Sequence, residues 1–92
     1  MNFRRSKLQI YIDILRNLQK SNGSMKKTHI VYKANLTHTR LKEYLDFLLS
    51  KEFIEEKNVG KETSFAITPK GVKFLGDINK LRKISDAFGV PL

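Results

Sequence analysis

The stretch ANLTHTRLKEYLDFLLS, residues 34–50, holds the end of one helix and the whole of the next. Asn35 tolerates the left-handed backbone conformation in which helices often end, and Leu36 is expected to fill the corner behind it. Thr37 has the hydroxyl of an N-cap residue. Apolar residues then recur at i, i+4, i+7 and i+8, as on one buried helix face: Leu41, Leu45, Leu48 and Leu49. This spacing predicts a helix over residues 38–50.

A shorter helix is predicted directly before this one, over residues 29–34. Thr28 is its expected N-cap. Apolar residues at helical spacing are expected to face inward: Ile30, Val31 and Ala34. Two helices joined by a short turn form a helix-turn-helix, whose second helix enters the major groove in proteins that bind DNA.

The N-terminal part of the chain predicts one further helix, over residues 7–20. Ser6 is its expected N-cap, and Gln9 completes a capping-box pattern three residues later. Five apolar residues form one stripe at helical spacing: Leu8, Tyr11, Ile12, Leu15 and Leu18. Ile10 and Ile14 widen this apolar face. The width indicates that more than one neighbour covers the helix, either from this chain or from a second one.

The residues after position 50 predict a β-hairpin. The stretches KEFIEEKN and TSFAIT, residues 51–58 and 63–68, have the apolar and β-branched composition of strands. The segment 53–58 is therefore expected to pair with 63–68. Its tip is expected to be basic, with Lys57 and Lys61.

A final helix is predicted after the hairpin. Thr68 and Pro69 suit the N-cap and the first helical position, and the apolar spacing that follows predicts a helix over residues 69–87. The expected order of elements is α-α-α-β-β-α. It is mainly α with a small β-hairpin wing, and it is the order of a winged helix-turn-helix.

The charge of the chain is distributed unevenly. Eighteen Lys and Arg against nine Asp and Glu give a net charge of +9 over 92 residues. Residues 1–42 contain ten basic residues and one acidic residue, whereas residues 43–92 contain eight of each. Such an excess favours a polyanionic partner, either nucleic acid or an anionic membrane surface, over a merely solubilising surface. The length is that of one domain, residues 1–92.

Several classes of function lack their usual residues. The chain has no cysteine, which excludes disulfides and thiolate metal sites. His29 and His38 lie nine residues apart without a matching carboxylate pattern, and there is no glycine-rich phosphate loop. We therefore expect no metal, no cofactor, no enzymatic activity and no identifiable small-molecule effector. No apolar run approaches the ~18 residues of a membrane span, so we expect a cytoplasmic, nucleoid-associated protein without membrane contact.

Two segments carry a resemblance to a known family. ANLTHTRLKEYLDFLLSKEFI (34–54) and FAITPKGVKFL (65–75) resemble the small archaeal winged-helix DNA-binding proteins. That group is related to the MarR and PadR type regulators and includes the basic "10a" chromatin-associated proteins. The resemblance implies binding of double-stranded DNA by a homodimer, with the last helix, 69–88, in contact with its partner. The residues expected at that contact are Phe74, Ile78, Leu81 and Ile84.

If helix 38–50 is the recognition helix, the exposed residues of its first turns are expected to face DNA. The candidate residues are His38, Thr39, Arg40, Lys42 and Glu43. Arg40 is the candidate reader of guanine, with a phosphate contact as the alternative. Thr39 is expected to meet a thymine methyl group or a phosphate, and His38 to donate to a phosphate or a base edge. Glu43 either accepts from cytosine or pairs with Lys42 or Arg40, and we favour the pair.

Contacts with the DNA backbone are expected from three further places. Those around the two helix starts are Lys26, Lys27, Thr28 and Thr37. Those in the wing are Lys57, Asn58 and Lys61. Those in a basic N-terminal arm are Arg4, Arg5 and Lys7. Each place has an alternative without DNA contact: a solvated loop at the helix starts, an ordinary exposed hairpin with nearby glutamates at the wing, and a frayed terminus at the N-terminal arm.

The sequence thus favours a homodimeric DNA-binding protein that regulates transcription. A nonspecific architectural protein of the nucleoid and a winged-helix subunit that binds an acidic protein partner remain alternatives. The varied hydrogen-bonding side chains at residues 38–43 lean toward specific binding, because a nonspecific binder needs fewer base-reading groups.

Overall fold

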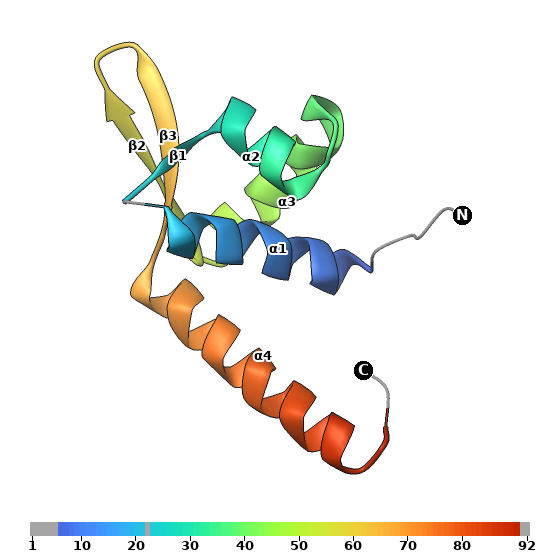
Figure 1. Ribbon diagram of the computed structural model, residues 1–92. Coiled ribbons are helices and arrows are strands. Elements are labelled where there is room, and N and C mark those ends of the chain that lie inside the picture. The colour runs from blue at the N-terminus through green and yellow to red at the C-terminus, as the bar shows by residue number, and fades with distance from the viewer. Residues whose placement is uncertain (1–5, 22, 91–92) are drawn as a thin grey trace.

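The computed structural model describes residues 6–21 and 23–90, which form four helices and a three-stranded antiparallel sheet (Figure 1). The elements are α1 (Lys7–Lys20), β1 (Met25–Lys26), α2 (Lys27–Ala34), α3 (His38–Ser50), β2 (Ile54–Val59), β3 (Glu62–Ile67) and α4 (Pro69–Ala87). This order confirms the predicted winged helix-turn-helix. The short strand β1 is an addition that the sequence did not predict.

The turn into α3 forms as its residues predict. Asn35 has a left-handed conformation, with φ 54° and ψ 56°, and ends α2. Leu36 is buried in the corner. The Thr37 hydroxyl accepts a hydrogen bond from the backbone N–H of Arg40 at 3.2 Å, and α3 begins at His38. These short-range contacts fix the angle between the two helices of the motif.

The start of α2 differs from the prediction. The helix begins at Lys27, and its N-cap is Lys26, which makes no side-chain capping bond. Thr28 lies inside the first turn, so its predicted capping role is wrong. The reason is that Lys26 is extended and pairs with Ser64 of β3. The chain therefore passes directly from strand to helix, without a capped turn.

The sheet has the strand order β1-β3-β2. The hairpin is confirmed, and each of its strands is shifted by about one residue from the prediction: Ile54 pairs with Ile67 and Val59 with Glu62. Gly60, with φ 65°, is the first residue of the two-residue turn, as type II′ turns require. Lys61 lies in this turn. Lys57 pairs with Ser64 inside β2, so its predicted place at the tip is wrong.

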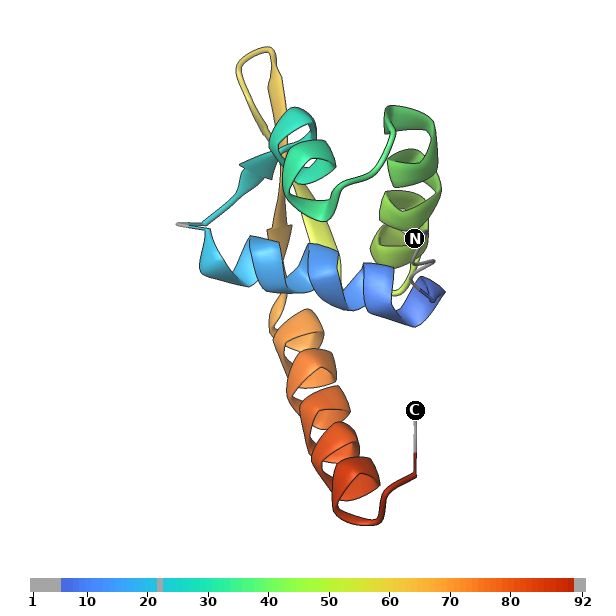
Figure 2. The ribbon, with the colours of Figure 1, turned by 45° about the vertical axis from the view of Figure 1, so that its right-hand side comes forward.

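Helix α1 is the centre of the core. It crosses the middle of the molecule, with α2, α3 and the sheet on one side and α4 on the other (Figures 1 and 2). Its fully buried residues are Ile10, Ile12, Ile14, Leu15 and Leu18. Contacts with α2, α3, β3 and α4 account for the wide apolar face within this one chain.

The capping of α1 follows only half of the predicted pattern. The Ser6 hydroxyl accepts from the backbone N–H of Gln9 at 3.1 Å. The Gln9 amide does not complete a capping box, because it donates to Asp13 at 2.8 Å and accepts from Arg82 of α4. The Gln9 side chain is therefore engaged by Asp13 and by Arg82, near the other end of the chain, and is not available to complete the capping box.

Helix α4 is anchored at its first turn. The Thr68 hydroxyl accepts from the N–H of Gly71 at 3.1 Å and donates to the carbonyl of Glu52 at 2.6 Å. Phe74 stacks on Phe53, with ring centroids 4.6 Å apart. From this anchor α4 runs away from the sheet below α1 (Figures 1 and 2). No helix in the described residues is long and apolar enough to cross a membrane.

Candidate nucleic-acid interface

The start of α3 and the turn of the hairpin lie on the same side of the molecule, and α4 leaves from the opposite side of α1 (Figures 1 and 2). The start of α2 lies between them, next to the hairpin. We call this side, defined by the first turns of α3, the start of α2 and the turn at Gly60 and Lys61, the candidate interface.

All five residues predicted on the recognition helix are exposed on α3. They are His38, Thr39, Arg40, Lys42 and Glu43. The opposite side of α3 is buried through Leu41, Tyr44, Leu45 and Leu48. The structure therefore brings the predicted polar side chains to one exposed surface, with the leucine face turned toward the core.

Arg40 lies at the edge of this surface, beside an aromatic cluster. Its guanidinium donates to the hydroxyl of Tyr44 at 3.3 Å and lies 6.0 Å from the centre of that ring. Tyr11 meets Tyr44 edge-on at 5.4 Å and stacks on Phe47 at 4.5 Å. Burial, and to a lesser degree the neighbouring Tyr44 and Glu43, raises the pKa of Tyr11 above its ordinary value. Arg40 therefore lies against a cluster of three aromatic rings, those of Tyr11, Tyr44 and Phe47.

The favoured pairing of Glu43 with Lys42 or Arg40 is wrong. Lys42 pairs instead with Asp46, with Nζ and Oδ2 3.0 Å apart. Residues four apart face the same side of a helix, whereas adjacent residues such as Lys42 and Glu43 point about 100° apart. Asp46 was missed among the candidate residues, although its spacing from Lys42 was visible in the sequence.

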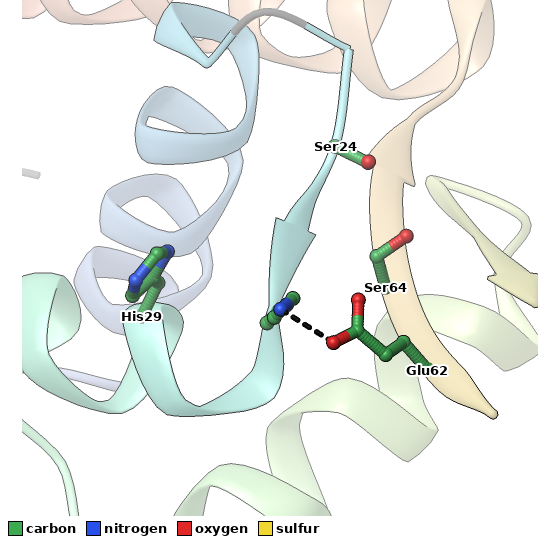
Figure 3. A pocket seen from close by; sticks show the side chains of 5 residues that line it. Ser24, His29, Glu62 and Ser64 are labelled. Carbon is green, nitrogen blue, oxygen red and sulfur yellow. Dashed lines mark hydrogen bonds and ion pairs between the residues drawn. The ribbon is translucent and has the colours of Figure 1, made fainter. Parts of the chain in front are cut away.

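The start of α2 is tied to the wing by an ion pair. Lys26 Nζ lies 2.8 Å from Glu62 Oε1 of β3. The pair borders a hollow of about 290 Å³, which is lined by Ser24, Lys26, His29, Glu62 and Ser64 (Figure 3). A neighbouring hollow of about 350 Å³ shares Ser24 and His29 and adds Lys20 and Lys33. Cationic side chains therefore gather around β1 and α2. Of these, only Lys26 and Lys27 were among the residues predicted to contact DNA.

The wing is less basic than predicted. Residues 54–67 contain three glutamates and two lysines. Lys57 lies 3.8 Å from Glu55 of the same strand, and Asn58 accepts from the Thr63 hydroxyl at 2.9 Å. Lys61 is exposed in the turn. The expected basic tip is thus a single lysine within a hairpin of net negative charge.

Helix α3 has no excess of positive charge either, because Arg40 and Lys42 are balanced by Glu43 and Asp46. Helix α4 carries five basic and two acidic residues. Of the predicted basic arm, Arg4 and Arg5 lie outside the described residues, and Lys7 is exposed at the first position of α1. The net charge of the chain therefore comes from segments other than α3 and the wing, chiefly residues 1–34 and α4.

The four predicted dimer residues divide into two pairs. Phe74 and Ile78 are partly buried and pack against the core of their own chain. Leu81 and Ile84 are exposed by 47% and 56%. Phe88, just after α4, is 80% exposed and continues the same side of the helix at three- and four-residue spacing. Only the C-terminal half of α4 therefore presents an uncovered apolar stripe.

No group of three or more His, Asp or Glu side chains in residues 6–21 and 23–90 is arranged to hold a metal ion. The residues that converge on the candidate interface are cations, hydroxyls and carboxylates from α2, α3 and the hairpin. Such a set suits recognition of a polar, charged surface by hydrogen bonds and ion pairs.

Comparisons with known proteins agree with the winged helix-turn-helix fold. A model of the family described as winged helix-turn-helix matches residues 4–86. Two uncharacterized proteins of Methanocaldococcus jannaschii are similar in sequence. MJ0290 is 32% identical over 88% of this chain, and MJ0287 is 33% identical over 92%. The chain spans only 36% of the length of MJ0290 and 81% of that of MJ0287.

Two solved structures illustrate the likeness in fold. Sso10a-2, a DNA-binding protein from Sulfolobus solfataricus, superposes with a TM-score of 0.77 at 26% identity, covering 91% of this chain and 85% of that one. AbsC, a MarR family transcriptional regulator from Streptomyces coelicolor, has a TM-score of 0.72 at 17% identity, covering 85% of this chain and 55% of that one. The fold thus occurs both in a small archaeal DNA-binding protein and in a bacterial regulator.

Proposed function

The chain belongs to the winged helix-turn-helix family, as its sequence predicted, and from this premise we propose that it binds double-stranded DNA as a homodimer and regulates transcription. The observation that carries the proposal is the exposed polar surface at the start of α3, on the same side as the turn of the wing. The family and its DNA-binding neighbours favour a binding role over a catalytic one.

In this proposal the first turns of α3 enter the major groove, where His38, Thr39 and Arg40 reach base edges or phosphates. Lys26, Lys27 and the exposed hydroxyl of Thr28 contact one DNA backbone beside α3. Lys61 contacts the backbone on the other side of the groove. Phosphate contacts of this kind fix the position of a protein on the duplex, and base contacts select the sequence.

Two lysines of the candidate interface have carboxylate partners in the free protein, namely Lys26 with Glu62 and Lys42 with Asp46. Both pairs are well exposed, and exposed ion pairs contribute only about 0–1 kcal/mol to stability. Exchanging a carboxylate for a DNA phosphate therefore costs little, so the pairs do not block binding.

The salt dependence of binding tests the proposal. We expect log K for a duplex to fall linearly with the logarithm of salt concentration, because each phosphate contact contributes a slope of about 0.9. The double variant Lys26→Ala/Lys27→Ala should lower this slope by up to about 1.8. Fluorescence anisotropy with a labelled duplex at several salt concentrations measures both quantities.

The matched control for this experiment is Lys80→Ala/Lys83→Ala, which removes the same charge from exposed positions on α4. Its slope should remain that of the native chain. A native affinity that hardly changes between low and moderate salt would rule out binding through phosphates. Equal losses in both double variants would instead indicate a general effect of net charge.

The homodimer rests on the apolar stripe of Leu81, Ile84 and Phe88. These side chains are exposed at three- and four-residue spacing along the end of α4 and its C-cap. Helix α4 itself lies on the side of α1 opposite to the candidate interface (Figure 1). In the proposed dimer they pack against the same residues of a second copy, as in two-fold symmetric interfaces. Two copies would present two α3 helices to one duplex, which suits a two-fold symmetric site.

Leu81→Glu is expected to convert this dimer to a monomer, because it places a charge within the apolar stripe. Sedimentation equilibrium should show the native chain at twice its mass of 10.7 kDa and the variant at 10.7 kDa. Val72→Glu is the control, since residue 72 is also exposed but lies on the other side of α4. A native chain that remains monomeric at tens of micromolar would contradict the homodimer.

A further inference from the structure

We propose that Glu43 and Asp46 make α3 a sequence-selective reader, which favours sites that offer cytosine amino groups and disfavours nonspecific binding. This inference rests on the proposed binding of duplex DNA and deepens it. It assigns roles to two carboxylates, and it decides between a selective regulator and a nonspecific architectural protein.

The position of the carboxylates on α3 is the first step. Leu41, Tyr44, Leu45 and Leu48 form the buried side of the helix. The residues that face directly away from this side recur at four- and three-residue intervals, and all are exposed: Thr39, Glu43, Asp46 and Ser50. The centre of the exposed surface therefore consists of two hydroxyls and two carboxylates.

The cations of α3 occupy the edges of that surface. Arg40 is drawn sideways to the hydroxyl and ring of Tyr44. Lys42 is held by Asp46 at 3.0 Å. If this exposed surface enters the major groove, its hydroxyls and carboxylates face the bases. The cations Arg40 and Lys42 lie at the sides of the helix, and only from there can they reach the flanking DNA strand.

The charge of the surrounding surface is the second step. Helix α3 has two basic and two acidic residues, and the hairpin has two basic and three acidic. Nonspecific affinity for DNA comes from the neutralisation of phosphates by cations. Helix α3 and the hairpin therefore contribute little to nonspecific affinity for DNA. Their carboxylates also repel the phosphate backbone of a duplex that does not match them.

The chemistry of the groove is the third step. In the major groove cytosine presents its N4 amino group, a donor that matches a carboxylate acceptor. Guanine presents the acceptors N7 and O6, and thymine presents O4, so these bases leave a carboxylate desolvated and unpaired. Adenine has an N6 amino donor, but the acceptor N7 lies beside it and faces the second carboxylate oxygen, so adenine is a poorer match than cytosine. Glu43 and Asp46 should therefore select C·G base pairs in one orientation at the positions that they face.

Binding-site selection from random duplexes tests this assignment with the full chain, Glu43→Gln and Asp46→Asn. The native chain should enrich one motif that contains cytosine. Each variant should lose the preference at one position, where native discrimination is about 5- to 150-fold. Each should also bind an unselected duplex about twofold to fivefold more tightly. Asp86→Asn, which removes the same charge from an exposed position on α4, should change neither quantity.

Enrichment of no motif by the native chain, while it still binds duplexes in a salt-dependent manner, would overturn the inference. It would favour an architectural role over a regulatory one, and it would leave the proposed binding of duplex DNA intact. An unchanged motif in both variants would also overturn it. If the native chain retains no duplex at any salt concentration, the proposed function fails, and the inference fails with it. Thermal unfolding of each variant should match the native chain, since both side chains are exposed.

Discussion

Gly71→Ala is expected to destabilise the fold by about 3 kcal/mol, although alanine is normally the better helix former. A Cβ atom at this position in the first turn of α4 would overlap the carbonyl oxygen of Phe53 and lie 2.7 Å from Cγ1 of Ile67. The Phe53 carbonyl cannot move freely, because it accepts the backbone N–H of Thr68 at 3.0 Å. The substitution must therefore displace α4 from its anchor on the sheet.

Gly76→Ala provides the matched control within the same helix. A Cβ at position 76 would meet no atom within 4 Å, so the change should stabilise the fold by up to about 1 kcal/mol. Urea denaturation followed by far-UV circular dichroism measures both variants. The prediction requires shifts of opposite sign in the midpoint. A native-like midpoint for Gly71→Ala would mean that α4 does not pack against the Phe53 carbonyl.

Caps and turns were predicted well from the sequence because they depend on contacts a few residues apart. Thr37 and Thr68 each accept the backbone N–H three residues later, as their positions indicated. Thr28 failed by contrast because Lys26 pairs with Ser64, a residue far away in the sequence. A two-residue strand has no periodicity of its own, so only its distant partner reveals it.

Side-chain partners were less predictable than elements. Arg40 and Glu43 fell on the predicted exposed surface because the leucine spacing fixes which side of α3 is buried. Their contacts were not predictable, because Tyr44 and Asp46 compete for the neighbouring cations. The charge excess in residues 1–42 was correct as a count. The count did not reveal that neither α3 nor the hairpin has a net positive charge. That distribution depends on where each element begins and ends.

Thr39→Glu is expected to weaken binding of duplex DNA by about 100-fold or more, because a like charge placed against the phosphates costs several kcal/mol. The residue is exposed in the first turn of α3, and the change gives that helix a net negative charge. The same carboxylate should leave the free energy of unfolding unchanged or raise it by about 0.3–1 kcal/mol. The first turn of α3 has no acidic residue at present, and a negative charge there favours the helix dipole.

The opposite directions of these two effects distinguish the interface from the fold. Fluorescence anisotropy and urea denaturation on the same preparation give both values. Gln19→Glu adds the same charge at an exposed position at the end of α1, outside the residues that define the candidate interface. It should reduce binding by less than about threefold, because salt screens exposed charges that make no direct contact. If Thr39→Glu binds duplex DNA as the native chain does, α3 does not approach the DNA through its first turn. Equal losses in Thr39→Glu and Gln19→Glu would instead mean that net charge, and not the geometry of α3, governs binding.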